Sequence, residues 1–334
     1  MDEDSEFYGE GNETLDDEFV NGFSAHYDVY PVVLAVLIIV ANGTALALVV
    51  RKKKLQTVTN GVLASLATSD LLAGLLGIPL YLVCNLTYHT AWCLSSAVFW
   101  RFVSISTVLH LTILTMHLFA TVGHLTRYEF VLRRKATTCL VCTAWLCAAF
   151  VSLVQLSWII VEDDRSEEER LRVHLTYSIA VLVLFLGVPL ATIVCCQLRI
   201  FAFICVYKRE CKARVSEKSN SSDDQPFAKV ASTWKTAVVF AGMSAVYLIC
   251  WAPYFILELV VDDAEMESLP LWAVYMLFYF TRFTASAVNP ILFVVGKSDF
   301  RRALREWLHC CSTAKAEEEA DHGTMHSLVQ SQRP

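Results

Sequence analysis

Seven long apolar runs constrain this 334-residue chain more than any other feature of its sequence. The third run begins after Trp92 and, beyond Arg101, only His110 and His117 interrupt it before the basic segment that starts at Arg127. As helices rising about 1.5 Å per residue, these runs can cross the roughly 30 Å hydrocarbon core of a bilayer. Because no water there can satisfy the backbone, the spans must be helical. They are expected at residues 30–50, 59–84, 93–123, 136–160, 174–207, 230–261 and 269–296.

The composition agrees with membrane embedding. Hydrophobic residues make up 55% of the chain and charged residues only 18%, with a mean hydropathy of +0.48. A soluble domain of this length is normally far more polar. These values exclude an ordinary soluble protein, and we expect no nucleic-acid partner.

Basic residues follow every second span. They are Arg51, Lys52, Lys53 and Lys54 after the first, Arg127, Arg133, Arg134 and Lys135 after the third, Lys208, Arg209, Lys212, Arg214 and Lys218 after the fifth, and Lys297, Arg301, Arg302 and Arg305 after the seventh. The positive-inside rule therefore places the N-terminus outside and the C-terminus in the cytoplasm. We expect a multi-pass protein of the plasma membrane. The acidic stretch 1–29, which has no Lys or Arg, becomes an extracellular tail.

Six short motifs occur in order along the spans. They are Asn42-Gly43, Leu66-Ala67-Thr68-Ser69-Asp70, Trp145, Pro189, Cys250-Trp251-Ala252-Pro253, and Asn289-Pro290-Ile291-Leu292-Phe293 followed by Phe300-Arg301. On these residues the chain resembles the rhodopsin-like G-protein-coupled receptors over about residues 30–311. The resemblance implies an all-α seven-helix receptor domain at 30–296, an amphipathic helix at 297–311 and a cytoplasmic tail at 312–334. It also implies an extracellular small-molecule ligand, a heterotrimeric G protein, contact with membrane lipid and, as a further option, a receptor dimer.

The activation switch of that family is incomplete in this chain. Counting from Cys93 and from Trp145 places His117-Leu118-Phe119 at the family's Asp-Arg-Tyr motif, so Leu118 replaces the arginine. The two switch tyrosines are replaced by Gln197 and Phe293, while Trp251, Pro253, Asn289 and Pro290 are retained. Two functions therefore remain open: a receptor that activates a G protein on binding ligand, and an atypical receptor that is constitutive, scavenges ligand or acts as a co-receptor. A seven-span enzyme or transporter is a remote third alternative, because no acidic partner for His110 and His117 and no internal repeat are evident.

Asp70 is an acid inside a span, and such residues usually mark a functional site because an unpaired carboxylate in lipid is unstable. In the family this aspartate binds sodium, and here Thr107, Ser286 and Asn289 could supply further oxygens. The alternative is that Asp70 is protonated or hydrogen-bonded and simply ties helices together. No other cofactor is expected.

The ligand pocket predicted from the resemblance is aromatic and carries both signs of charge. Its expected members are Trp100, Arg101, Ser104, Trp251, Tyr254, Phe255, Glu258, Tyr279 and Arg282. Trp100 stands where amine receptors carry an aspartate, whereas two arginines facing one cavity would suit a carboxylate, phosphate or sulfate. An internal pair between Glu258 and an arginine is the alternative. A visual pigment is excluded, because Phe283 replaces the lysine that binds retinal.

Covalent sites are expected near both membrane surfaces. The sequons at Asn12 and Asn85 predict glycosylation, although a bare disordered tail remains an alternative at Asn12. Palmitoylation is expected at Cys310 and Cys311, directly after a basic amphipathic stretch.

Cys93 lacks the partner that the family usually provides, since the 161–173 loop has no cysteine. Cys84 and Cys93 are either bonded across the short loop between them or two free thiols. Receptors of the lipid, adenosine and melanocortin group also depart from the usual bridge, which favours that branch of the family.

Overall fold

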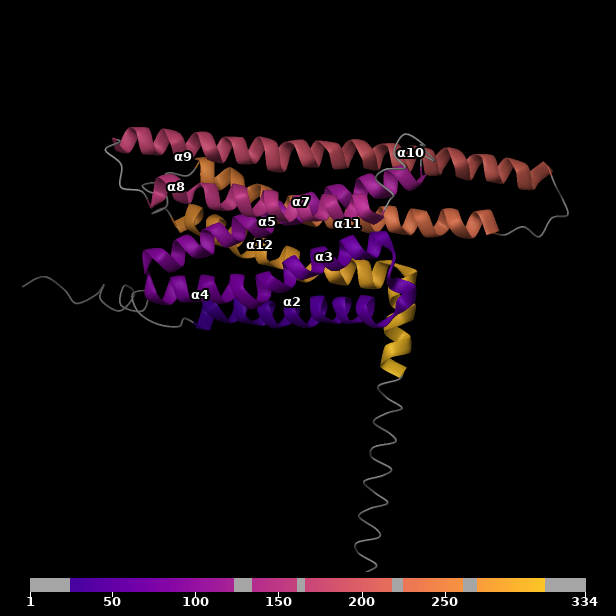
Figure 1. Ribbon diagram of the computed structural model, residues 1–334, viewed down its shortest axis with the longest axis horizontal. Helices are drawn as coiled ribbons and strands as arrows, with labels where there is room; N and C mark the ends of the chain where they lie inside the picture. The colour runs from indigo at the N-terminus through magenta and orange to yellow at the C-terminus, as the bar shows by residue number, and fades with distance from the viewer. Residues whose placement is uncertain (1–24, 123–133, 161–165, 218–224, 261–268, 310–334) are drawn as a thin grey trace, which may run out of the picture.

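The computed structural model describes residues 25–122, 134–160, 166–217, 225–260 and 269–309 (Figure 1). Within these ranges, residues 25–27, 167, 210–217, 225–232, 254, 257–260 and 269–280 are described by their backbone alone. Statements about side chains below refer to the remaining residues.

The chain forms seven helical spans. They are α2 (Ala25–Arg51); α3 (Val58–Leu72) with η2 (Ala73–Gly77) and α4 (Ile78–Thr87); α5 (Thr90–Val122); α7 (Arg134–Val154) with α8 (Leu156–Ile159); α9 (Glu167–Val181) with η4 (Leu182–Gly187) and α10 (Val188–Glu217); α11 (Gln225–Val260); and α12 (Leu269–Gly296). A short turn, η1 (Lys53–Leu55), joins the first two spans, and a further helix at 298–309 follows α12. The predicted all-α seven-helix bundle is confirmed.

The outer faces of the helices are apolar, as a bilayer requires. Among the described residues, six helices are long and apolar enough to cross a membrane. Leu146, Phe150 and Ile249 are each about 70% exposed on these helices, at 72%, 70% and 68%. Large apolar side chains facing outward over whole helices are typical of lipid contact rather than of a soluble surface.

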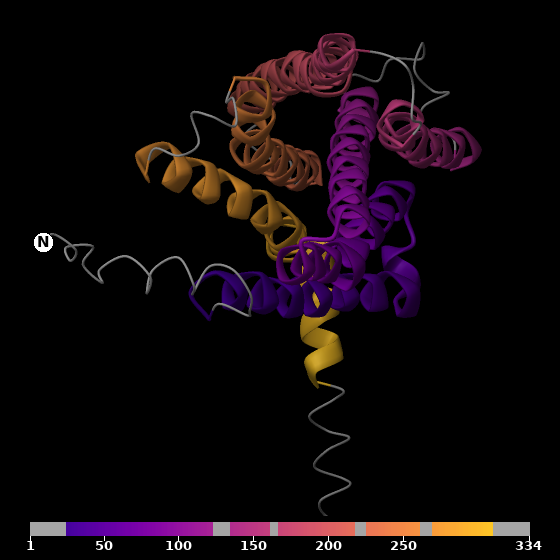
Figure 2. The same ribbon diagram turned by 90° about the vertical axis from the view of Figure 1, so that its left-hand side faces the viewer.

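The third span, α5, is the central helix. Of the 18 consecutive residues that make up its most apolar stretch, 72% are buried inside the bundle. For the span made of α9 and α10 the corresponding share is 22%. It contacts α3, α4, α7, α10 and α11, and Figure 2 shows it in the middle of the bundle, between α7 and α11. Side chains on α5 are therefore close to most other helices, which makes this span the natural support for a central site.

Motif residues make the polar contacts that hold the spans in register. The Trp145 Nε1 donates to the Ser65 hydroxyl, which also lies 2.9 Å from His110 Nε2, so α3, α5 and α7 meet at one point. The side-chain amide of Asn42 donates to the carbonyls of Ile38 and Ser286, each at 3.0 Å, and links α2 to α12. In a low-dielectric interior such buried hydrogen bonds fix the relative rotation of the helices.

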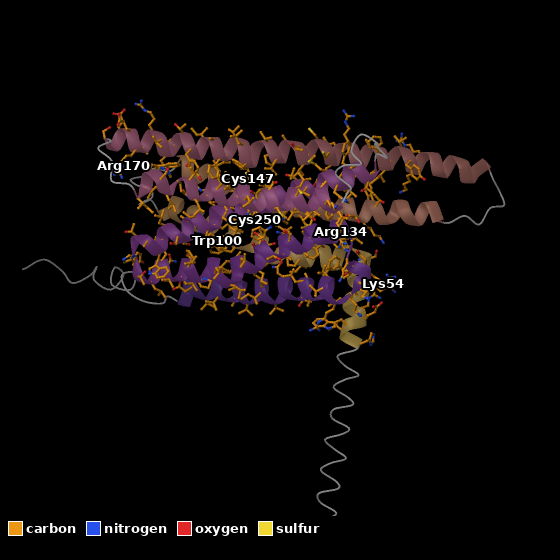
Figure 3. The ribbon with its side chains drawn as sticks, in the orientation of Figure 1. Lys54, Trp100, Arg134, Cys147, Arg170 and Cys250 are labelled. Carbon is orange, nitrogen blue, oxygen red and sulfur yellow. A yellow bond between two sulfur atoms is a disulfide. The ribbon has the colours of Figure 1, made fainter. Side chains whose placement is uncertain are left out.

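Two ends of the bundle can be told apart by charge. Lys54 and Arg134 lie towards one end, which we call the Lys54 end, and Arg170 lies at the opposite end (Figure 3). A disulfide joins Cys84, near the end of α4, to Cys93, near the start of α5. We call this opposite end the Cys84 end. The bonded alternative for the two cysteines is thus the one that the structure adopts.

Glycine is needed where α11 and α12 pack most closely. A Cβ atom added at Gly296 would lie 2.2 Å from Cγ2 of Val239, whose branched side chain has little rotamer freedom. We expect Gly296→Ala to destabilise the chain by about 1–3 kcal/mol through overpacking. A thermal melt of the detergent-purified protein measures this loss.

Gly61→Ala is the matched control, since a Cβ at Gly61 meets nothing within 4 Å and the residue lies inside α3. Its expected effect is neutral or stabilising by about 0.4–1 kcal/mol, because alanine restricts the unfolded chain. Equal melting temperatures for the two variants would show that α11 and α12 do not approach this closely.

Candidate functional site

A cluster of aromatic rings surrounds Trp100 in the interior of the bundle. Trp100 is 1% exposed, and its ring centroid lies 4.5 Å from that of Phe283 and 6.4 Å from that of Trp251. Phe283 in turn meets Tyr81 edge-on at 5.2 Å. Gly77 makes this approach feasible, because a Cβ there would lie 3.0 Å from the Trp100 ring. Helices α4, α5, α11 and α12 therefore converge on one aromatic centre.

Arg282 places a positive charge against this aromatic centre. Its side chain is 2% exposed, and its guanidinium carbon lies 5.5 Å from the Trp100 ring centroid and 5.0 Å from that of Phe283. Both distances are within the range of cation–π attraction. Because a guanidinium does not lose its proton in proteins, the charge is permanent.

Arg101 lies on a different side of α5. Its guanidinium carbon is 5.1 Å from the ring of Tyr177 in α9, and the Tyr177 hydroxyl donates to the Val151 carbonyl at 2.6 Å. Adjacent residues on a helix point about 100° apart, which agrees with Trp100 lying against Phe283 of α12 while Arg101 lies against Tyr177 of α9. The two arginines that were expected to face one cavity thus contact different helices.

A column of rings on α11 continues from the aromatic centre. Tyr247 stacks on Trp251 at 6.3 Å, Trp251 stacks on Phe255 at 6.0 Å, and the Tyr247 hydroxyl lies 2.9 Å from Ser104 Oγ. Tyr247 was not predicted, although its spacing of four residues from Trp251 puts both on one helix face. The side chains of Tyr254, Glu258 and Tyr279 lie outside the described residues, and so does the proposed Glu258–arginine pair.

Asp70 lies in a fully buried polar cluster between α3 and α12. It is 0% exposed, and its Oδ2 accepts a hydrogen bond from Asn289 Nδ2 at 3.1 Å. The Oδ1 atoms of Asp70 and Asn289 and the Ser69 hydroxyl are buried without a hydrogen-bond partner. Thr107 and Ser286 are each 2% exposed. Uncoordinated oxygens of this kind suit a hard cation or ordered water, while the Asn289–Asp70 bond also ties two helices directly.

The switch positions are mostly apolar and packed. Leu118 is 7% exposed within the core, and Phe293 is 1% exposed with its ring 5.2 Å from that of Phe300. Gln197 is 6% exposed, and neither its amide oxygen nor its nitrogen has a hydrogen-bond partner among the described residues. Phe119 contacts Phe203 at 6.5 Å. Hydrocarbon side chains, Leu118 and Phe293, thus occupy the places where the family has the arginine and one tyrosine, and the amide of Gln197 occupies the place of the other tyrosine.

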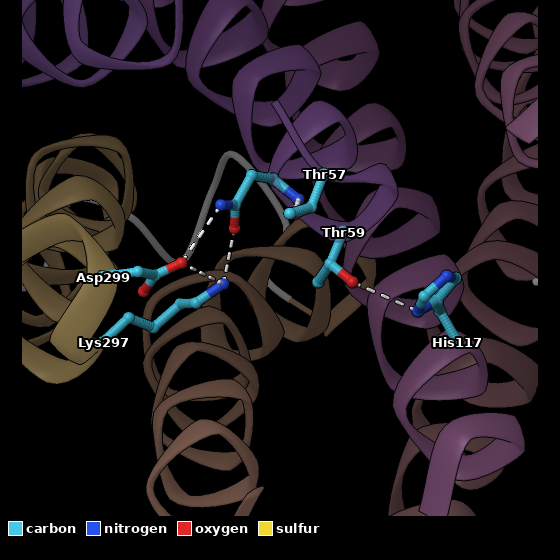
Figure 4. A network of polar contacts seen from close by, with 6 residues as sticks. Thr57, Thr59, His117, Lys297 and Asp299 are labelled. Carbon is cyan, nitrogen blue, oxygen red and sulfur yellow. Dashed lines mark hydrogen bonds and ion pairs between the residues drawn. The ribbon is translucent and has the colours of Figure 1, made fainter. Parts of the chain in front are cut away.

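A second polar network lies at the Lys54 end (Figure 4). Lys297 Nζ donates to Asn60 Oδ1 and lies 3.8 Å from Asp299 Oδ2, which also accepts from Asn60 Nδ2 at 3.1 Å. Nearby, His117 Nδ1 lies 3.2 Å from the Thr59 hydroxyl. Burial lowers the pKa of Lys297, although Asp299 opposes that shift. The sequence did not reveal this network, since Asn60 and Lys297 are 237 residues apart.

The remaining predicted sites lie at the edges of the described chain. Asn85 is half-buried in the last turn of α4, and the Thr87 hydroxyl of its sequon donates to the Val83 carbonyl at 2.7 Å. Asn12, Cys310 and Cys311 lie outside the described residues.

A groove of about 540 Å³ opens on the side of the bundle, between α4, α5 and α7. Its walls are largely apolar, with Leu80, Leu94, Phe99, Phe102, Leu153 and Leu156 among them. The predicted pocket residues whose side chains the structure describes do not line it, so it is separate from the Trp100 centre.

Comparison with known proteins gives consistent matches over most of the chain. The family model described as "7 transmembrane receptor (rhodopsin family)" matches residues 41–293. Melatonin receptor type 1C of Gallus gallus is 23% identical over 293 residues, covering 83% of this chain and 80% of the relative. Melatonin receptor type 1A of Mus musculus is 26% identical over 301 residues, covering 85% of this chain and 82% of the relative. A D(5)-like dopamine receptor of Takifugu rubripes is 24% identical over 310 residues, covering 84% of this chain and 67% of the relative.

The structure also resembles solved ones. It matches a crystal structure of squid rhodopsin with a TM-score of 0.71 and 17% sequence identity, covering 88% of this chain and 89% of that one. At this identity the likeness concerns the fold alone.

Proposed function

The chain belongs to the rhodopsin family of seven-transmembrane receptors, and on that premise we propose that it senses an extracellular anionic or lipid-like small molecule and activates a heterotrimeric G protein. It is a multi-pass membrane receptor and not an enzyme. The observation that carries the proposal is the permanent charge of Arg282, buried against Trp100 and Phe283.

The charge of Arg282 argues against an amine ligand. Among the relatives, the dopamine receptor is named for an amine, and an ammonium group close to Arg282 would be repelled strongly in a low-dielectric interior. A carboxylate or phosphate would instead be attracted to the guanidinium and accept a charge-assisted hydrogen bond from it. The surrounding rings of Trp100, Trp251 and Phe255 supply apolar contact for the rest of such a ligand.

A second function is favoured by the packed switch. Leu118, Gln197 and Phe293 offer no arginine or hydroxyl with which to hold a cleft open for a G protein. This favours an atypical receptor that binds its ligand, or pairs with another receptor, without ligand-switched coupling.

One experiment separates these two functions. The native chain and a Leu118→Arg/Gln197→Tyr/Phe293→Tyr variant are expressed at equal surface levels, and G-protein activation is measured without ligand and against small carboxylates, phospholipids and neutral aromatic compounds. Activation of the native chain by an anionic compound supports our proposal. Activation of the restored variant alone supports the atypical receptor, and a response only to neutral compounds contradicts the anionic pocket.

The orientation of the receptor is part of the proposal. Lys54 and Arg134 lie at one end of the bundle. Arg170, which lies near the start of α9 beside Glu168 and Glu169, lies at the other (Figure 3). This charge difference supports a cytoplasmic Lys54 end and an extracellular N-terminus. Palmitoylation at Cys310 and Cys311 and glycosylation at Asn12 and Asn85 would agree with it.

We further propose that the oxygens around Asp70 hold a sodium ion. The expected result is that sodium chloride raises the melting temperature of the native chain, by the equivalent of about 1.4 kcal/mol at ten times the dissociation constant. Asp70→Asn should remove this response, because the variant lacks the carboxylate charge but keeps a similar shape. Thermal melts in sodium chloride and in choline chloride of equal ionic strength provide the measurement, and an equal response of both proteins would support the helix-tying role alone.

A further inference from the structure

Two basic segments that are distant in the sequence meet at one corner of the Lys54 end. Lys52 Nζ lies 3.4 Å from Glu306 Oε2, which joins the connection after α2 to the helix at 298–309. Figure 3 shows Lys54 next to the start of this helix. The exposed cations brought together are Arg51, Lys53, Lys54, Arg302 and Arg305, and we call this set the basic corner.

The helix at 298–309 turns its arginines outward because its other face is packed. Phe300 and Ala303 are buried, at 0% and 6% exposure, and Leu304 and Trp307 pack against the core. These four positions follow the spacing of one helical face. Arg302 and Arg305 lie on the other face and are exposed.

The two carboxylates of the helix at 298–309, Asp299 and Glu306, interact with residues outside the basic corner. Glu306 pairs with Lys52, and Asp299 is engaged by Lys297 and Asn60. No carboxylate in the described part of the chain forms an ion pair with a member of the basic corner. Among the described residues, the corner therefore concentrates positive charge that no ion pair offsets.

The basic corner directly follows the apolar helix α2, at the level where lipid headgroups are expected. Arg51 is the last residue of α2, whose most apolar window has a mean hydropathy of 2.7, so the hydrocarbon ends close to this residue. Basic residues at this level attract anionic lipids strongly.

We propose that the basic corner binds one phospholipid whose headgroup carries several negative charges, such as a phosphorylated inositol, in the adjacent leaflet. A headgroup with a single negative charge needs the cations of only one of these two segments. Several phosphate groups are needed to engage Lys53 and Lys54 together with Arg302 and Arg305, which come from two segments. The site requires neither the ligand nor the G protein proposed above, so it can be tested independently of them.

The test measures binding of a fluorescent phosphatidylinositol bisphosphate to the purified full-length chain in non-ionic detergent. Lys53→Gln/Lys54→Gln and Arg302→Gln/Arg305→Gln are each expected to weaken binding by roughly fivefold per removed charge. Arg170→Gln/Arg172→Gln removes the same charge from exposed residues at the Cys84 end and is expected to leave binding unchanged. Higher salt should weaken the native interaction.

Several results would overturn the proposal. These are equal binding of phosphatidylcholine or of phosphatidylserine with the same acyl chains, an equal loss in the Arg170→Gln/Arg172→Gln control, or a loss in only one of the two corner variants. Glu306→Gln tests the opposite change in charge, because it removes a negative charge and releases Lys52 from its ion pair. Tighter binding of this variant supports a charge-driven site, and weaker binding contradicts it.

Discussion

Lys297→Met is expected to lower the stability of the folded chain by about 1–3 kcal/mol. The change leaves the fully buried Asn60 Oδ1 without its donor, and an unsatisfied buried polar atom has a penalty of that size. The lost ion pair adds little, because the side chain of Asp299 is 37% exposed and solvent screens it. Thermal melts of the detergent-purified protein measure the change.

Lys54→Met is the control for this prediction, since Lys54 is exposed and outside the network. Its melting temperature should equal that of the native chain.

In the proposed receptor, the network ties α3 to the junction of α12 and the helix at 298–309, at the end where a G protein would bind. Lys297→Met is therefore also expected to raise ligand-independent activation, and an unchanged melting temperature together with unchanged basal activation would contradict a stabilising network.

The same lysine predicts a dependence on pH. Burial lowers the pKa of Lys297 from its ordinary value of 10.5, so between the lowered pKa and 10.5 the unfolded chain binds more protons at this group than the folded chain. Stability contributed by this group therefore rises with pH across that window. Lys297→Met should lack this rise, and parallel pH profiles for the two proteins would show that the ammonium is not desolvated.

The sequence predicted the spans well where lipid determines them. Span three, expected at 93–123, is α5 at Thr90–Val122. Span five, expected at 174–207, is longer in the structure and runs from Glu167 to Glu217. Hydropathy detects the part of a helix inside the hydrocarbon, whereas the hydrogen bonds of a helix continue into water without an apolar signal.

The sites were harder to predict, because they depend on helix rotation and on contacts between distant residues. Both arginines next to the aromatic positions were predicted for one pocket, but the rotation of α5 directs Arg101 to Tyr177 and leaves Arg282 with Trp100. Motif spacing fixes the order of residues along a helix and does not fix what each one faces. The Lys297 network has no local pattern at all, since its members come from α3 and from the end of α12.

Arg282→Met is expected to weaken the response to an anionic ligand by roughly 100-fold, the usual effect of removing one partner of a buried charged hydrogen bond. Methionine is apolar, flexible and able to pack against the Trp100 ring, so the aromatic centre should remain folded. Arg282→Lys keeps the charge and loses the planar fork, so an intermediate loss is expected. Dose–response curves of G-protein activation, corrected for surface expression, provide the measurement.

Arg101→Met discriminates between the pocket predicted from the sequence and the one that the contacts favour. If both arginines clasp the ligand, the two methionine variants should lose affinity by similar factors. Because Arg101 packs on Tyr177 and Arg282 on Trp100, we expect only Arg282→Met to shift the curve, while Arg101→Met affects thermal stability. Equal shifts would restore the two-arginine pocket, and an unshifted Arg282→Met curve would place the ligand away from the Trp100 centre.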